Sequence, residues 1–126
     1  MVREICLDSD VIIDLSKNVD QIKSRLISLD ALFYITSINV FEVWFGRKEK
    51  DNALEFLEKF GVLDLNKSSA LLAADILRDL KKEGLILDFR DIFVASICIT
   101  NKIELMTNNL KHFERFKKFG LRLVSL

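Results

Sequence analysis

The sequence predicts a three-layer α/β/α fold with a mainly parallel central sheet of about four to five strands. Short runs of apolar and β-branched residues, typical of buried strands, alternate along the chain with longer runs of helical spacing. Half of the 126 residues are hydrophobic, which is enough for a full core in a single domain over residues 1–126. The chain has no proline and only four glycines, so no linker is expected.

The first strand and the first helix lie in the run REICLDSDVIIDLS, residues 3–16. Residues 5–7 suit a strand buried on both faces, and apolar residues then recur at helical spacing. Asp8 stands between the two, at the carboxyl end of the strand, where parallel α/β sheets place their ligands. The alternative is that Asp8 or Ser9 only caps the helix.

The next elements are a helix, a strand and a second helix. Residues 18–21 resemble a capping box, and they predict a helix over residues 19–29. Residues 33–36 are aromatic and β-branched, which indicates a strand. Ser37 is then expected to cap a helix that ends at Gly46.

Glu42 lies in that helix among apolar and aromatic neighbours. A lone carboxylate in such a setting costs several kcal/mol unless a cation or a hydrogen-bond donor compensates. Glu42 is therefore a candidate site residue. The alternative is a glutamate on the one solvated stripe of the helix, paired with Arg47 or Lys48.

The middle of the chain carries no chemistry that the sequence reveals. An amphipathic helix is predicted over residues 48–60, with Gly61 as its end, and a short strand over residues 62–65. Ser68 is expected to cap a further helix that ends at Gly84. The charged residues of both helices are interpreted as solvated faces.

Two aspartates stand three residues apart at the head of the next helix, in the run LILDFRDIFVASICITN. Asp88 is placed to be the N-cap. Asp91 lies one turn in, where the helix dipole favours negative charge. The alternative is that Asp91 only stabilises the start of the helix and belongs to no functional site.

The last part of the chain predicts a strand over residues 103–107, a short basic helix over residues 110–119 and a final strand over residues 121–124. Asn109 follows the first of these strands at its carboxyl end. His112 lies on the basic helix and is interpreted as a surface or packing residue.

The composition excludes several classes of protein. Nineteen basic and nineteen acidic side chains give a formal net charge of zero, so the chain does not coat nucleic acid by bulk charge. A single histidine argues against a histidine zinc site or a Ser-His-Asp triad. No apolar run is long enough to cross a bilayer, and the N-terminus is no signal peptide. Cys6 and Cys98 are expected to be reduced core residues of a cytoplasmic protein.

The candidate acids are expected to meet at one edge of the sheet, because parallel strands share the edge at which their carboxyl ends lie. Carboxylates at close range repel, so their pKa values rise unless a cation lies between them. An all-oxygen site suits Mg²⁺ or Mn²⁺, and such an ion is suited to hydrolysing phosphodiesters with an activated water. The residues expected to converge are Asp8, Asp10, Glu42, Asp91 and Asn109.

Four segments, LDSDVI, FEVWFG, DIFVASI and TNNLKHF, resemble the PIN-domain ribonucleases, specifically the small VapC-type toxins of prokaryotic toxin–antitoxin pairs. They occur in the same order and at similar spacing, and the resemblance covers nearly the whole chain. It implies a PIN-like fold and a metal-dependent endoribonuclease. It also implies a homodimer, a cognate antitoxin that covers the active site, and structured RNA, including transfer RNA, as substrate.

The resemblance also assigns residues. Asp8 matches the family's first metal-binding aspartate, Glu42 the glutamate of the E-x-x-x-G segment with Gly46 as its glycine, and Asp91 the aspartate before the apolar stretch. Asn109 stands where many PIN domains have a fourth acid, a departure that leaves three firm ligands. The predicted site is thus Asp8, Glu42 and Asp91 as catalytic and metal-binding residues, Asn109 as a further ligand, and Ser9, Asp10 and Thr107 in support.

Basic residues form two clusters that could contact RNA phosphates. The first cluster includes Lys50, and the second, on the basic helix, includes Arg115, Lys117 and Lys118. A solvated helix face is the alternative for each of them. The predicted RNA contacts are Arg47, Lys48, Arg90 and Lys111.

Two other functions compete with this one. ICLDSDVII also resembles the nucleophile motif of haloacid-dehalogenase-like phosphatases, in which Asp8 would attack phosphorus and Asp10 would act as the acid. That hypothesis requires a lysine beyond a later strand and a cap insertion, and it leaves Glu42 unexplained. The other is a degenerate PIN module that binds RNA or protein without catalysis. Asn109 favours it, and the three acids speak against it.

Overall fold

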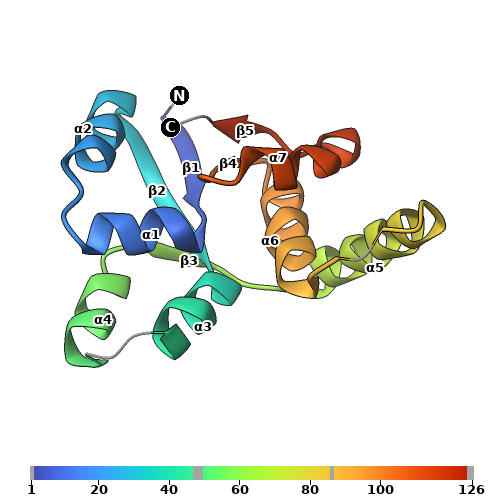
Figure 1. Cartoon of the computed structure of the whole chain (residues 1–126), viewed down its shortest axis with the longest axis horizontal. Helices are drawn as coiled ribbons and strands as arrows, with labels where there is room; N and C mark the ends of the chain where they lie inside the picture. Colours follow the sequence, from blue (N-terminus) through green and yellow to red (C-terminus); the bar gives the residue numbers. More distant parts are fainter. Residues whose placement is uncertain (1, 47–49, 86, 125–126) are drawn as a thin grey trace.

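The protein is described by a computed structural model over residues 2–46, 50–85 and 87–124 (Figure 1). Strands and helices alternate along most of the chain, as the sequence predicts. The elements are β1 (Arg3–Leu7), α1 (Ser9–Ser16), α2 (Asp20–Leu29), β2 (Ala31–Thr36), α3 (Ser37–Gly46), α4 (Lys50–Leu57), β3 (Gly61–Leu63), α5 (Lys67–Lys82), α6 (Phe89–Thr100), β4 (Glu104–Met106), α7 (Leu110–Phe113), the 3₁₀ helix η1 (Glu114–Phe119) and β5 (Leu123–Val124).

The sheet has five strands in the order β3-β2-β1-β4-β5, and each neighbouring pair is parallel. β1 lies at the centre, where Cys6 is in register with Tyr34 of β2 and Leu105 of β4. The predicted α/β class and the parallel sheet are both confirmed.

The central strand is buried on both faces. Cys6 packs into one hydrophobic core, whereas its neighbours Ile5 and Leu7 pack into a second core on the opposite face. All three side chains are fully buried. This arrangement explains why β1 reads as a continuous apolar run and not as an alternation of apolar and polar residues.

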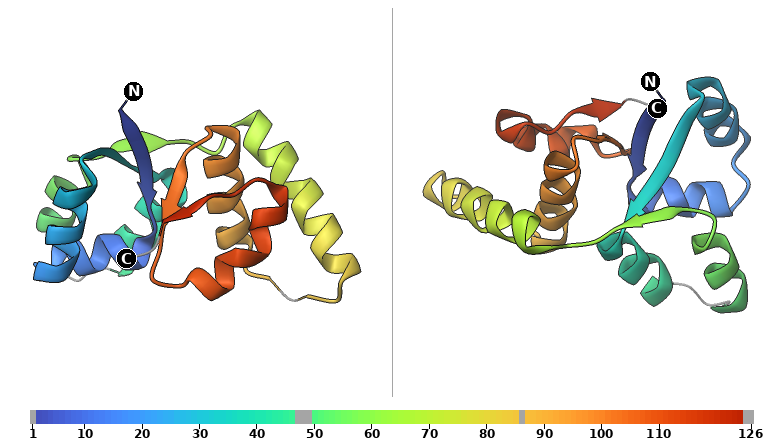
Figure 2. Two further views of the ribbon diagram at one scale, coloured as in Figure 1. Left: turned by 90° about the horizontal axis from the view of Figure 1, so that it is seen from above. Right: turned by 180° about the vertical axis from the view of Figure 1, so that it is seen from behind.

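The helices divide between the two faces of the sheet (Figure 2). α5, α6 and α7 supply the core around Cys6, while α1, α2, α3 and α4 supply the core around Ile5 and Leu7. Cys6 and Cys98 are free and buried, as expected. Within the described ranges no helix has the length and apolar character needed to span a membrane.

Three predicted helix caps are wrong. Asn18 has a positive φ of 59° and belongs to a turn, and α2 begins without a side-chain cap. The hydroxyl of Thr36, not that of Ser37, accepts the N–H of Asn39 at the start of α3. α5 starts from Asn66, which forms a reciprocal capping box with Ser69, so Ser68 has no such role. At the starts of α3 and α5 the sequence offers several polar residues close together, and side-chain direction selects one.

Two boundaries also differ from the prediction. Gly61 does not end α4, which stops at Leu57, but opens β3. A Cβ at position 61 would lie 2.8 Å from the ring of Tyr34, so glycine is needed there for close packing on β2. The predicted basic helix over residues 110–119 is one α turn followed by a 3₁₀ helix.

Candidate functional site

The site lies where β1, β2 and β4 end. The backbone N–H of Asp8 donates to the carbonyl of Met106 at 2.9 Å, which joins the carboxyl ends of the two central strands. Thr107 directly follows β4, and Thr36 is the last residue of β2. Parallel pairing therefore gathers residues from distant parts of the sequence at this edge.

Asp8 is the innermost acid of the site, with an exposed fraction of 9%. Its Oδ1 accepts the backbone N–H of Ser9 at 2.9 Å, and its Oδ2 accepts the hydroxyl of Thr107 at 2.8 Å. Burial raises the pKa of Asp8 to about 7, and the nearby charges of Asp10 and Asp91 add to this effect. Asp8 both caps α1 and occupies the site, so the two interpretations of this residue hold together.

Glu42 reaches the same place from α3. Its Oε1 accepts the hydroxyl of Ser9 at 2.8 Å, and its Oε2 lies 3.7 Å from Nη1 of Arg90. The side chain is 24% exposed. Among the described residues its partners are therefore Ser9 and Arg90, whereas Arg47 and Lys48, the partners in the solvated-stripe alternative, lie outside the described residues.

Asn39 links these two acids and was missed by sequence reasoning. The residue is fully buried. Its Nδ2 donates to the Ser9 hydroxyl at 2.9 Å and lies 3.5 Å from Oδ1 of Asp8, while its Oδ1 accepts both the N–H and the hydroxyl of Thr36. The available signal was its position three residues before Glu42, on the same face of a helix.

Asp91 lies at the start of α6, and its charge acts on Asp8. Its Oδ2 is 2.6 Å from Nε2 of His112, and both side chains are about a quarter exposed, 28% and 27%. The interpretation of His112 as a surface or packing residue did not include this contact with Asp91. The interaction could not be foreseen, because α6 and α7 meet only through the tertiary fold.

Asp10 supports the same edge from the first turn of α1. Its Oδ2 accepts the backbone N–H of Asn108 at 3.2 Å, while its buried Oδ1 has no hydrogen-bond partner within the described chain. Burial raises the pKa of Asp10 as well. Asp10 thus adds uncompensated negative potential beside Asp8.

Asn109 comes to the site mainly through its backbone, whose N–H donates to the Thr107 hydroxyl at 3.0 Å. Thr107 in turn holds Asp8, so Asn109 helps to fix that carboxylate indirectly. The residue is exposed, and its side chain forms no cap hydrogen bond at the start of α7.

The predicted RNA contacts differ in their surroundings. Arg90 forms an ion pair of 2.8 Å with Asp88 at the rim of the site and thereby lowers the pKa of that carboxyl. Lys111 is exposed on α7. Arg47 and Lys48 lie outside the described residues.

The donors at this edge fit a hard divalent cation in their chemistry. Asp8 carries a raised pKa, and Asp10 has a buried oxygen without a partner among the described residues, so a cation at this place would compensate buried carboxylates. In the described part of the chain, no three His, Cys, Asp or Glu side chains are close enough together to enclose a metal ion. Glu42 and Asp91 instead interact with Arg90 and His112.

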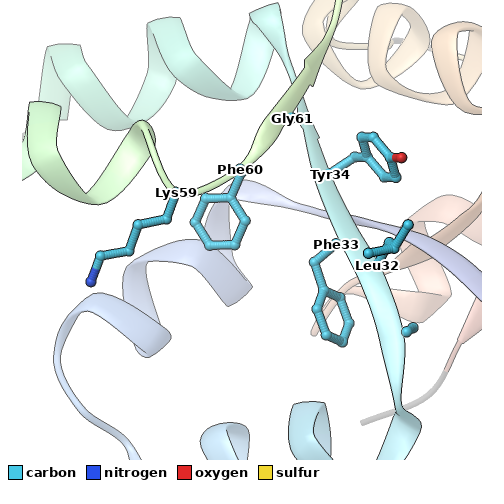
Figure 3. Close-up of a pocket in the computed structure, with 7 residues that line it drawn as sticks. Leu32, Phe33, Tyr34, Lys59, Phe60 and Gly61 are labelled. Carbon is cyan, nitrogen blue, oxygen red and sulfur yellow. The ribbon is translucent and has the colours of Figure 1, made fainter.

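A cavity of about 410 Å³ lies elsewhere, where β2 and β3 begin (Figure 3). It is lined by Ala31, Leu32, Phe33, Tyr34, Lys59, Phe60 and Gly61. In a parallel sheet all strands begin at one edge and end at the other. The cavity lies where β2 and β3 begin, so it is remote from Asp8, which follows the end of β1. Its lining is mainly apolar and offers no carboxylate.

This chain is similar to known proteins over nearly its whole length. The family model described as PIN domain matches residues 5–119. Ribonuclease VapC1 of Methanocaldococcus jannaschii is 29% identical over 119 residues, which cover 92% of this chain and 88% of that protein.

Two solved structures share the fold. VapBC2 from Rickettsia felis, bound to a DNA fragment from its promoter, has a TM-score of 0.85 at 23% identity and covers 98% of both chains. DNA-bound VapBC from Salmonella typhimurium has a TM-score of 0.83 at 23% identity, covering 99% of this chain and 98% of that one.

Proposed function

This chain belongs to the PIN-domain family, and on that premise we propose that it is a ribonuclease, the toxin of a VapBC-type toxin–antitoxin pair. The names of its relatives support this assignment. The single observation that carries it is the buried Asp8, with a pKa of about 7, beside Glu42 and Asp91 at the carboxyl edge of the sheet. The family match leaves the phosphatase reading without support.

The proposed cofactor is Mg²⁺ or Mn²⁺, held by Asp8, Glu42 and Asp91 with Asn109 as a further ligand. When bound, such an ion stabilises charge on the phosphodiester and activates the water that attacks it. Its positive charge would also offset the repulsion that raises the pKa of Asp8.

The chain's own residues prepare the site. Thr107 and the N–H of Ser9 hold the two oxygens of Asp8, while the Ser9 hydroxyl holds Glu42. Asn39 fixes the Ser9 hydroxyl in turn. The acids are thus oriented by hydrogen bonds before substrate arrives, which reduces the reorganisation that catalysis requires.

The proposed substrate is RNA, with transfer RNA as one candidate. Arg90 is suited to contact a phosphate, because its guanidinium lies at the rim beside Glu42 and is half exposed. Lys111 is a second contact on α7. Arg47 and Lys48 are proposed from the sequence alone.

The proposed partner is a cognate antitoxin. α3 exposes Phe41, Trp44 and Phe45, with exposed fractions of 57%, 40% and 81%, on the helix that carries Glu42. Exposed aromatic groups of this size mark protein–protein contact surfaces. A partner on this face of α3 would lie next to the site.

We also propose a homodimer that acts in the cytoplasm. Leu71, Leu85 and Phe89 are large exposed apolar residues on or beside α5 and α6, and a second copy could cover them. The reduced, buried Cys6 and Cys98 are consistent with a reducing compartment. Light scattering of the protein freed of antitoxin measures its oligomeric state.

The experiment that tests the function is cleavage of total RNA by protein purified free of antitoxin, with the cut ends mapped. Mg²⁺ or Mn²⁺ should support cutting, EDTA should stop it, and Asp8→Asn should reduce the rate about a hundredfold or more while the domain stays folded. Cutting that persists with EDTA and in Asp8→Asn would overturn the assignment.

A non-catalytic PIN module remains the second candidate, and Asn109 in place of a fourth acid is the feature that favours it. The same assay separates the two functions. RNA binding without cleavage at any divalent ion concentration would support the binding module instead.

A further inference from the structure

His112 and Asp91 form the shortest contact among the site's side chains given above. They lie 21 residues apart in sequence, on α7 and at the head of α6, and their Nε2 and Oδ2 atoms are 2.6 Å apart. A distance of this length is typical of a hydrogen bond that involves a charged group. Asp91 therefore has one of its two oxygens already engaged.

The second ring nitrogen of His112 lies beside a donor, and this contact assigns the tautomer of the ring. Nη2 of Arg115 lies 3.4 Å from Nδ1 of His112, within hydrogen-bond reach. A guanidinium can only donate, so Nδ1 accepts and Nε2 carries the hydrogen. His112 then donates to Asp91, and the three side chains form a chain from Arg115 through His112 to the carboxylate.

Asp91 otherwise keeps a free oxygen. Within the described chain, Oδ2 has the hydrogen bond to His112, and no hydrogen bond to Oδ1 is present. The charge of Asp91 acts on Asp8, so the two carboxylates interact electrostatically. Fixing Oδ2 limits the rotation of the carboxylate and leaves Oδ1 as the available ligand.

We propose that His112 is a positioning residue for the cation site: it donates Nε2–H to Oδ2 of Asp91 and so holds Oδ1 ready for a divalent ion. Hydrogen bonds to ligating carboxylates tune metal sites in this way, and their loss weakens metal binding about 10- to 100-fold. The proposal rests on the cation site of the proposed function.

A purely structural role is the competing explanation. The ring of His112 also packs edge-on against Phe113, with 5.6 Å between the ring centroids, and Phe113 belongs to the core. His112 could thus only fasten α7 to α6. That role would affect the unfolding temperature but not the affinity for a cation.

The test measures Mn²⁺ binding by the electron paramagnetic resonance signal of free Mn²⁺, on the full chain freed of antitoxin. His112→Phe keeps a ring of similar size without a donor, whereas Gln in His112→Gln places an amide N–H near the position of Nε2. The matched control is Glu114→Gln, an exposed neighbour outside the site. Thermal unfolding of each variant accompanies the titration.

We expect His112→Phe to weaken Mn²⁺ binding about 10- to 100-fold and His112→Gln to restore it to within about threefold of the wild type. Glu114→Gln should bind like the wild type. In cleavage assays the defect of His112→Phe should lie in the Mn²⁺ concentration needed for half-maximal rate and should largely disappear at saturating Mn²⁺.

Two results would overturn the positioning role: His112→Phe that binds Mn²⁺ as the wild type does, and a folded His112→Gln that is as defective as His112→Phe. If phenylalanine prevents folding, His112→Met supplies the donor-free comparison. Wild-type protein that binds no Mn²⁺ would instead refute the proposed cation site itself, so the two failures are distinguishable.

Discussion

The inner and outer carboxylates of the site differ in how their negative charge is balanced. Asp8, the inner one, is 9% exposed and is held by a hydroxyl and a backbone N–H. Glu42 and Asp91, the outer ones, are 24% and 28% exposed and face Arg90 and His112. Within the described residues, a guanidinium and an imidazole therefore meet the outer acids at the rim, whereas only neutral donors hold Asp8.

This difference identifies Asp8 as the carboxylate whose charge the described residues balance least. Water and the donor groups at the rim can compensate the outer acids, whereas burial removes water from Asp8 and raises its pKa. A divalent cation at the centre would compensate the charge that the chain leaves unbalanced. The rim groups then orient the outer acids and need not neutralise the inner one.

The largest expected effect is on the pH dependence of stability, through Asp8→Asn. Below pH 3.8 Asp8 is protonated in both the folded and the unfolded state, so it does not change the free energy of unfolding. Between pH 3.8 and about 7 Asp8 is ionised in the unfolded state but still protonated in the folded state. The free energy of unfolding therefore falls as the pH rises through this range. Asp8→Asn removes this penalty. Relative to wild type, the variant should gain about 2–4 kcal/mol between pH 4 and pH 8.

Urea unfolding at several pH values in EDTA measures this gain. Saturating Mg²⁺ or Mn²⁺ should then stabilise the wild type at pH 8 and leave Asp8→Asn nearly unchanged. A difference between the two proteins that is constant from pH 4 to pH 8 would show that Asp8 is not the unbalanced centre of the site.

A smaller effect is expected for Asn39→Ala, which removes the link between inner and outer acids. Thr36 would lose the acceptor for its N–H and its hydroxyl in a fully buried position. The free energy of unfolding should fall by about 2–3 kcal/mol, and cleavage should fall too, because the Ser9 hydroxyl loses a donor.

The control for Asn39→Ala is Asn101→Ala, an exposed asparagine at the end of α6 that donates to the carbonyl of Ile97. Urea unfolding of both variants gives the comparison, and Asn101→Ala should cost less than about 1 kcal/mol. Equal costs for the two would contradict a special role of the buried amide.

The smallest effect on stability is expected for Arg90→Gln at the rim. Its ion pairs are exposed, so the unfolding midpoint should hardly move. Cleavage should fall roughly three- to tenfold at low salt, and less at high salt, because a phosphate contact is lost. Faster cleavage would instead show that Arg90 competes with the cation for Glu42.

The sequence predicted the α/β class and the parallel sheet because hydrophobic periodicity follows secondary structure directly. The apolar run before Asp8 indicated a strand covered on both faces, as β1 is. The caps at residues 37 and 68 were wrong because neighbouring polar residues compete for the same N–H groups. The cap at residue 18 was wrong because Asn18 has a positive φ and belongs to the turn before α2.

The sequence predicted the acids of the candidate site, and it did not predict the hydrogen bonds that hold them. Asp8, Glu42 and Asp91 stood out because each is an acid at the head or inside of an apolar element. Asn39 and His112 did not, since an amide in a helix and a histidine among basic residues are ordinary at the level of sequence. Their roles depend on which groups the fold brings within 3 Å.

By itself, the amino-acid sequence determined the layers of this protein, the edge at which its acids collect and the family to which its motifs are similar. The tertiary structure alone decided that Thr107 and the N–H of Ser9 hold the buried Asp8, while Glu42 meets Ser9 and Asp91 meets His112. The physical reason is range: periodicity and capping act over a few residues, whereas burial and charge balance depend on atoms that are distant in sequence and adjacent in space.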